Sequence, residues 1–444
     1  MASTYLSRSV SSTGNRRKWT FSAWLKRAVT SAQNYIFTCN NGSNQYAMIG
    51  FNNDGRLRYY DYTNTYQSHV ATNRLFRDTN AFYHVVVIYD SAQSTSSDRI
   101  KFYVNGVQET SFETASYPSQ DHDSFMNLSG LTMNIGRETG TTNLYNGIMS
   151  HVHFSDGYAY DASTFGETDS TTGEWKIKTS PSFTLGTNGF TVLKDGNTIT
   201  DQSSNSNDFS LSAGTLTKTE DNPSNVFATM NPLNVPTSNA PSFSYGNTKT
   251  QTAGTSGRFG GTSTLGMAKG KFYIEAKAIV DATYSRNCIG ICYNPVDQAR
   301  NNDTHYSYSD GWSYNSETGA VVTLGTTFYT ASTYTTGDII QMAIDCDNWK
   351  LYYGKNGTWL NSGDPTSGST GTGSVSLTAD KTYFVIQSDN TGTSSPSTFE
   401  FNFGNGYFGS TQISSAGTNA SGNGIFEYDV PTGYTALSTK GLNE

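Results

Sequence analysis

The stretch from Arg56 to Gln67 gathers four tyrosines and several hydrogen-bonding side chains in twelve residues. They are Tyr59, Tyr60, Tyr62, Tyr66, Arg56, Arg58, Asp61 and Asn64. Aromatic rings stack on the faces of sugar rings, while polar neighbours bond to the hydroxyl groups. We predict a glycan- or partner-binding face made by Tyr60, Asp61, Tyr62 and Tyr66. The alternative is that alternate tyrosines pack within the sheet, because tyrosine is a favoured strand residue.

A second aromatic pair, Trp312 and Tyr314, lies in the stretch from His305 to Asn315, which we expect to form two strands around Asp310-Gly311. The pair offers the same stacking chemistry, so both residues are candidate binding residues. Packing inside a hairpin is the alternative reading of the same pattern.

Catalytic patterns are absent from the sequence. Sugar hydrolysis needs two carboxylates roughly 5–10 Å apart over one cleft, yet Glu275 stands alone among Phe272, Tyr273 and Ile274. Turn chemistry explains Asp345 and Asp347. No nucleophile elbow or phosphate loop is present. We therefore expect no enzyme and no catalytic residue.

Metal-ligand patterns are incomplete as well. His151 and His153 alternate, which would place both on one strand face, but no third ligand follows. A core or interdomain face is the simpler explanation for the pair. Cys288 and Cys292 also share a face of one expected strand, without the partner pair that a zinc site needs. We expect neither a metal nor a cofactor.

Two hairpins of the same plan organise the chain. The stretch from Asp338 to Trp359 has alternating Ile340, Met342 and Ile344, an Asp/Asn-rich turn, a second strand and a closing Asn356-Gly357. The stretch from Tyr83 to Gly106 repeats this order and ends in Asn105-Gly106. Asn-Gly favours the tight turns of hairpins, so two β-sandwich domains of related architecture are predicted.

Composition agrees with an all-β chain of two jelly-roll-type sandwiches. Aromatic residues make up 13% and glycines number 43 in 444 residues, without long helix-forming runs. The net charge of −8 argues against nucleic-acid binding, which needs clustered cations. No run is long and apolar enough to insert into a membrane. The four cysteines fit synthesis in a reducing cytoplasm.

Residues 1–155 resemble the laminin-G-like, concanavalin A-type jelly roll. The resemblance rests on WTFSAWLKR, YHVVVIYD, RIKFYVNGV and NIGRETGTTNLYNGIMSHVHFSDG, with Tyr145 departing from the usual closing aromatic position. Some laminin-G-like relatives bind calcium at loop carboxylates, a role that Asp54 and Asp61 would fill here. No dense run of oxygen ligands supports calcium binding.

Residues 156–235 read as an irregular connector packed on the first domain, with short strands at Phe190–Leu193 and Phe209–Leu211. Its pieces resemble, in their order, a connector common in marine bacteriophage proteins. The matching pieces are STFGE, TTGEW, GTNGF, DQSSNSNDF and NPSNVFATMNPL.

Residues 236–410 resemble the SPRY family in KGKFYIEA, CIGICY, YSYSDGWSYN, GDIIQMAIDCDNWKLYYGKNGTW and TYFVIQ. In that family the motif around Trp312 and Tyr314 forms a structural hairpin. Residues 411–444 form a C-terminal extension, whose stretch GIFEYDVPTGYTALSTKGLNE resembles the ending of the same phage proteins.

These resemblances imply a non-enzymatic virion protein of a marine bacteriophage, made in the host cytoplasm. We expect an attachment or surface-display role as a tail fibre, spike or capsid-surface appendage. Its partners would be other virion proteins and host surface glycan, and fibre-like roles favour a homo-oligomer. A polysaccharide depolymerase and a purely architectural capsid-decorating or tail-joining protein are the alternatives.

Overall fold

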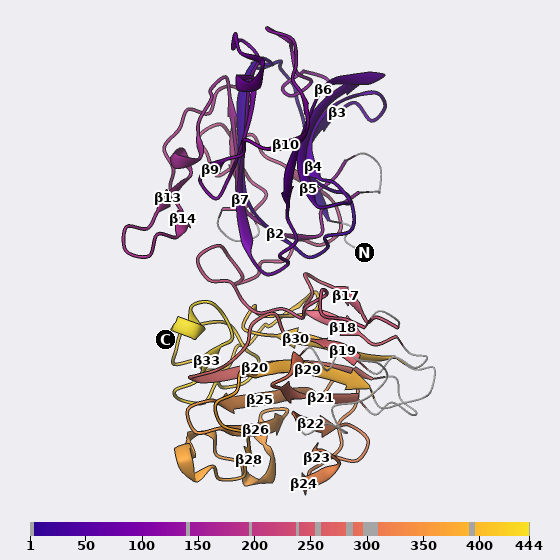
Figure 1. The fold of residues 1–444 in the computed structure, drawn as a ribbon, viewed down its shortest axis with the longest axis vertical. Helices are drawn as coiled ribbons and strands as arrows, with labels where there is room; N and C mark the ends of the chain where they lie inside the picture. Colours follow the sequence, from indigo (N-terminus) through magenta and orange to yellow (C-terminus); the bar gives the residue numbers. More distant parts are fainter. Residues whose placement is uncertain are drawn as a thin grey trace. The chain divides into compact units, whose positions relative to one another are not determined.

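The computed structural model describes residues 4–138, 143–194, 198–236, 239–253, 259–280, 287–295, 310–389 and 396–443. The chain forms two compact units, Met1–Lys218 and Thr219–Glu444, and the regular secondary structure described in both is almost all β-strand (Figure 1). The predicted all-β class and two sandwiches are therefore confirmed. In the described part of the chain, no helix has the length and apolar character needed to cross a membrane.

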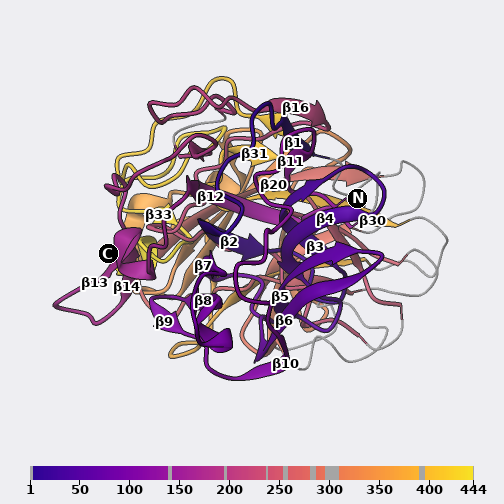
Figure 2. The ribbon, with the colours of Figure 1, turned by 90° about the horizontal axis from the view of Figure 1, so that it is seen from above.

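The first unit stacks two antiparallel sheets (Figures 1 and 2). One is eight-stranded, in the order β10 (Phe112–Ser116), β6 (Thr65–Leu75), β5 (Arg56–Thr63), β4 (Gln45–Phe51), β3 (Asn34–Asn40), β11 (Thr132–Ile135), β1 (Tyr5–Ser9) and β16 (Ser210–Ala213). The other is six-stranded, in the order β15 (Phe190–Val192), β12 (Gly147–Asp156), β2 (Lys18–Arg27), β7 (Phe82–Asp90), β8 (Ile100–Val104) and β9 (Val107–Gln108). A small hairpin joins β13 (Gly166–Thr168) to β14 (Trp175–Ile177).

Alternation along the strands builds the core of this unit. Trp19 and Phe21 of β2 point inward and meet inward residues of the eight-stranded sheet. The Trp19 ring lies 5.4 Å from the ring of Tyr59, and Phe21 stacks on Phe37 at 5.0 Å. Because alternate side chains point to opposite faces, this packing leaves the even-numbered residues of β5 on the outer face.

The predicted Asn-Gly turns adopt the expected backbone. Asn105 and Gly106 have φ of 48° and 82°, and Asn356 and Gly357 have φ of 49° and 83°. Positive φ at both central residues matches the right-handed twist of the flanking strands. Each dipeptide thus reverses the chain where the sequence predicted.

The second unit also pairs two sheets. The larger contains β17 (Ser242–Ser244), β18 (Lys249–Gln251), β30 (Ser397–Asn402), β20 (Lys271–Val280), β25 (Ile339–Asp345), β26 (Lys350–Lys355) and β27 (Thr358–Trp359), with β28 (Val375–Ser376) on β26 and β33 (Thr435–Ala436) on β20. The smaller is ordered β19 (Phe259–Thr262), β29 (Phe384–Asp389), β21 (Asn287–Cys292), β22 (Gly311–Asn315), β23 (Ala320–Thr323) and β24 (Thr326–Thr330). A hairpin of β31 (Tyr407–Phe408) and β32 (Thr411–Gln412) completes the unit.

The boundary between the units lies earlier than residue 235. The chain divides after Lys218, and Phe227, Ala228 and Met230 are buried with the hydrophobic residues of the second unit. The end of the connector therefore supplies core residues to the second sandwich, which its Asn/Ser-rich sequence did not indicate. Positions 305–309 of the expected aromatic hairpin lie outside the described residues, while Gly311–Asn315 forms β22.

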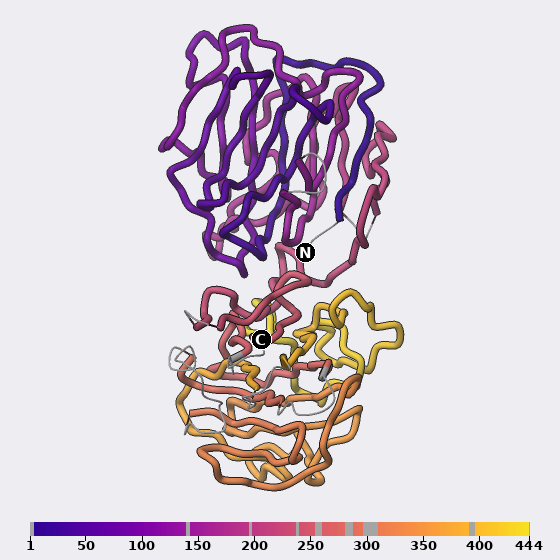
Figure 3. The backbone as a smooth tube through the Cα atoms, turned by 90° about the vertical axis from the view of Figure 1, so that its right-hand side faces the viewer, coloured from indigo at the N-terminus to yellow at the C-terminus, as the bar shows by residue number. Residues whose placement is uncertain are grey.

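The C-terminal extension is part of the second sandwich. Its strand β33 runs parallel to β20, and Phe426, Val430 and Tyr434 pack on Tyr273 and Tyr352. In the tube trace these last residues, in yellow, run beside strands of the same unit (Figure 3). Burial of this apolar surface holds the extension in place.

Candidate binding face on the first unit

The outer face of the eight-stranded sheet carries a row of polar and aromatic side chains. In the strand register Thr132, Asn40, Tyr46, Tyr62 and Tyr66 are successive cross-strand neighbours on β11, β3, β4, β5 and β6. At about 4.8 Å between strands, the five positions span about 19 Å. We call this set the outer row.

A cluster of aromatic rings surrounds the tyrosine end of the outer row. Tyr46 stacks on Tyr62 with ring centroids 4.8 Å apart, and Tyr66 stacks on His69 at 4.9 Å. Beneath them lie Tyr35, Met48 and Tyr60. The tyrosine cluster, as we call it, comprises Tyr35, Tyr46, Met48, Tyr60, Tyr62, Tyr66 and His69.

Only part of the cluster is accessible. Tyr66 is 54% exposed, and Tyr46 and Tyr62 are half-buried. Tyr60 is only 4% exposed because Tyr66 packs edge-on over it at 5.4 Å and its hydroxyl bonds to that of Tyr35 at 2.9 Å. Tyr60 and Tyr62 lie on one face, as the predicted binding face requires, but Tyr60 supports the surface instead of forming it.

Asp61 faces the interior, so its predicted role at the surface is wrong. Its carboxylate is completely buried and accepts hydrogen bonds from the Tyr59 hydroxyl (2.7 Å), the Phe125 amide (3.0 Å) and the Ser124 hydroxyl (3.1 Å). Burial raises the pKa of Asp61 above its ordinary value. Asp54 instead lies in the turn before β5 and pairs with Arg56 at 3.1 Å, so the structure does not bring these two carboxylates together as calcium ligands.

Trp312 and Tyr314 are core residues of the second unit. They are 4% and 0% exposed, and Trp312 packs edge-on against Tyr383 at 5.7 Å. The Tyr314 hydroxyl donates to the Ser332 carbonyl. Both rings point inward from β22, as the packing alternative held, and neither offers a face to a ligand.

A buried guanidinium lies under the tyrosine cluster. Arg58 is 7% exposed, and its charged group lies 5.3 Å from the ring of Tyr35 and 5.1 Å from that of Tyr60. It donates to the Tyr35 hydroxyl, its Nε has no hydrogen-bond partner, and no carboxylate among the described residues pairs with it. The sequence placed Arg58 near the tyrosines but gave no sign that this cation is buried with them.

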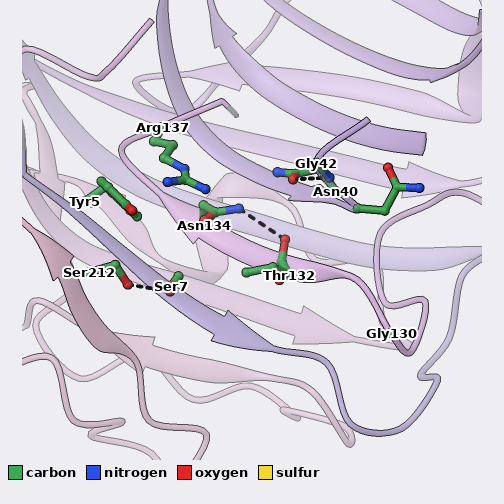
Figure 4. A pocket seen from close by; sticks show the side chains of 10 residues that line it. Tyr5, Ser7, Asn40, Gly42, Gly130, Thr132, Asn134, Arg137 and Ser212 are labelled. Carbon is green, nitrogen blue, oxygen red and sulfur yellow. Dashed lines mark hydrogen bonds between the residues drawn. The ribbon is translucent and has the colours of Figure 1, made fainter. Parts of the chain in front are cut away.

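A polar pocket of about 270 Å³ adjoins the Asn40 end of the outer row (Figure 4). It is lined by Tyr5, Ser7, Asn40, Thr132, Asn134 and Arg137, among others. Sequence reasoning missed it, because its side chains come from β1, β3, β11 and the segment after β11. No local pattern connects these stretches.

The two histidines on β12 belong to the interior. His153 is 3% exposed, and its Nδ1 lies 2.9 Å from the Thr191 hydroxyl, while burial holds its pKa well below the ordinary value. Among the described residues, no three His, Cys, Asp or Glu side chains gather as a metal site would need.

Comparison with known proteins agrees with the laminin-G-like and the SPRY resemblance. Residues 2–163 match the concanavalin A-like lectin/glucanases superfamily, and residues 271–375 match the SPRY domain family. No curated protein matches the chain.

Three solved structures, one of them of a human protein, are among those similar to parts of the chain. The SPRY domain of human HERC1 is 18% identical, covering 34% of this chain and 81% of that one (TM-score 0.26). A pentraxin from Limulus polyphemus is 18% identical, covering 34% of this chain and 69% of that one (TM-score 0.26). Domain 4 of an extracellular arabinanase from Geobacillus stearothermophilus is 13% identical, covering 33% of this chain and 64% of that one (TM-score 0.26).

The family matches correspond to the two units found in the structure. The first lies within Met1–Lys218 and the second within Thr219–Glu444. Lectin-like and SPRY domains support a binding role. The chain thus carries a laminin-G-like, concanavalin A-type domain followed by a SPRY domain.

Proposed function

We propose that this chain is a non-enzymatic structural protein of a bacteriophage virion, of the attachment or surface-display type. It would act as a tail fibre, a spike or a capsid-surface appendage, and its first unit would bind host glycan or another virion protein. The observation that supports the binding part is the tyrosine cluster, where Tyr46, Tyr62 and Tyr66 remain accessible on the outer face of the eight-stranded sheet.

The cluster suits a sugar better than a purely apolar partner. The Tyr62 and Tyr66 rings are set edge to face at 5.4 Å, so they present differently oriented surfaces to a ligand. Asn40 and Thr132 continue the outer row with amide and hydroxyl groups. Apolar faces beside hydrogen-bonding groups match the two kinds of surface on a sugar ring.

The virion context rests on the connector, whose pieces resemble those of marine phage proteins, and on the order of the two domains. Synthesis in the host cytoplasm agrees with four cysteines that are all buried thiols. We propose other virion proteins and host surface glycan as partners, and a homo-oligomer as the assembled form.

The proposal is tested by binding of the purified chain to host surface polysaccharide, with Tyr66→Ala and Tyr62→Ala as variants. Each loss of a stacking ring should weaken binding about fivefold, equivalent to about 1 kcal/mol. Tyr158→Ala is the matched control, since Tyr158 is 43% exposed and lies after β12, outside the tyrosine cluster.

Imaging of labelled protein on intact particles tests the virion part separately. Absence from the particle would exclude a structural role, whereas binding unchanged in both variants would exclude the tyrosine cluster as the contact surface. Detection at the tail or on the shell would also distinguish a fibre from a capsid appendage.

A further inference from the structure

We propose that the polar pocket beside the outer row is a subsite for a sugar carboxylate, so that the ligand of the first unit is an acidic glycan. The inference rests on the proposed glycan binding and names the class of sugar. The pocket has three relevant features. It contains a guanidinium without an ion-pair partner and a buried side-chain carbonyl without a hydrogen-bond partner, and it lies in register with the tyrosine cluster.

The guanidinium of Arg137 is held in place without using its outer donors. Its central carbon lies 4.1 Å from the centre of the Tyr5 ring. Its Nε is buried without a hydrogen-bond partner, and its other nitrogens form no hydrogen bond or ion pair with a described residue. Stacking on an aromatic face leaves the N–H groups at the edge of the guanidinium available for a carboxylate, which accepts two parallel bonds.

Asn134 adds an acceptor next to this cation (Figure 4). Its side chain is completely buried, and its Nδ2 donates to the Thr132 carbonyl at 3.2 Å. Because a backbone carbonyl can only accept, this bond fixes which end of the amide is the oxygen. Its Oδ1 has no partner, and an unsatisfied buried carbonyl favours a ligand hydroxyl in the pocket.

Hydroxyl and amide groups complete the lining. The Ser7 and Ser212 hydroxyls lie 2.5 Å apart, and Asn40 donates to the Glu138 carbonyl at 3.1 Å. The Glu138 carboxylate lies on the neighbouring residue, and its Oε2 accepts a hydrogen bond from Asn143 Nδ2 at 2.5 Å. Among the described residues, no ion pair joins it to Arg137.

The register connects the pocket to the tyrosine cluster. Asn134 pairs with Thr38, Thr38 with Met48, and Met48 with Tyr60, while the outer row runs alongside through Asn40 and Tyr46. A chain of sugars lying across the strands would therefore meet both. One acidic sugar would occupy the pocket, and neighbouring sugars would stack on Tyr46, Tyr62 and Tyr66.

The test compares two trisaccharides of the same linkage, one of galacturonic acid and one of galactose, by calorimetric titration of the full chain. The acidic trisaccharide should bind at least tenfold more tightly than the neutral one, and added salt should reduce this preference. Arg137→Gln should abolish the preference, and Arg137→Lys should restore only part of it because an ammonium lacks the fork geometry. Arg77→Gln is the control of equal charge change at an exposed arginine.

Four outcomes overturn the inference. Equal binding of the two trisaccharides, or a preference for the acidic trisaccharide that survives in Arg137→Gln, shows that the pocket does not bind a carboxylate through Arg137. If only the neutral trisaccharide binds and Tyr62→Ala weakens that binding, the carboxylate subsite is refuted, but glycan binding by this face is supported. If neither trisaccharide nor host polysaccharide binds, both proposals fail. An unchanged melting temperature of each variant excludes loss by unfolding.

Discussion

Replacing Tyr60 by alanine should destabilise the first unit far more than replacing Tyr66, although both rings belong to the same cluster. Tyr60 is 4% exposed and Tyr66 is 54% exposed. Truncating a buried aromatic side chain to alanine costs about 3–5 kcal/mol, because contacts are lost and a cavity remains. An exposed ring costs about 0.5 kcal/mol.

Contacts around Tyr60 place its cost at the lower end of that range. Its hydroxyl bond to Tyr35 at 2.9 Å contributes about 1 kcal/mol, but Arg58 still donates to the Tyr35 hydroxyl after the change. Arg58 would lose its contact with the Tyr60 ring and keep the one with the Tyr35 ring. We therefore expect about 3 kcal/mol for Tyr60→Ala and about 1 kcal/mol for Tyr60→Phe.

Scanning calorimetry of the full chain measures this directly. For a unit of this size, 1 kcal/mol lowers the melting temperature by about 2–4 °C. Tyr60→Ala should lower the first unit's transition by about 6–12 °C and Tyr66→Ala by about 1–2 °C, with the second unit's transition unchanged as internal control. Equal shifts for the two alanine variants would refute the assignment of Tyr60 to the interior.

Three further predictions concern pH and catalysis. Burial raises the pKa of Glu275 to about 7, so between about pH 4.5 and 7 the folded second unit holds a proton that the unfolded chain releases. The melting temperature of this unit should therefore fall as the pH rises from about 4.5 to 7. Calorimetric scans at several pH values would check this trend, which should be absent from the Glu275→Gln variant. Burial lowers the pKa of His84 to about 3, so the first unit should instead weaken as the pH falls below 6.5, and a flat profile above pH 4 would contradict this. The purified chain should release no reducing ends from host polysaccharide; release that a single carboxylate substitution abolishes would establish a depolymerase.

Local sequence patterns were sufficient for the strands and their turns. Alternation in the stretch from Trp19 to Lys26 places Trp19 and Phe21 on one face of β2, and Asn105-Gly106 and Asn356-Gly357 predicted two reversals of the chain. These features depend on the two-residue period of a strand and on backbone torsions, which neighbouring residues determine. The boundary after Lys218 was not predictable in this way, because it depends on where Phe227 and Met230 are buried.

The candidate site also combines features that local sequence determines with features that depend on tertiary packing. The sequence by itself determined that Tyr60 and Tyr62 share a face and that Tyr59 lies opposite. Only the tertiary structure decided that the face carrying Tyr59 and Asp61 is the one buried inside the sandwich, that Tyr60 lies beneath Tyr66, and that Arg137 and Asn134 meet Tyr5 at one pocket. Alternation separates two faces without saying which one is covered, and the pairing of β1 with β11 joins residues more than a hundred positions apart in the chain.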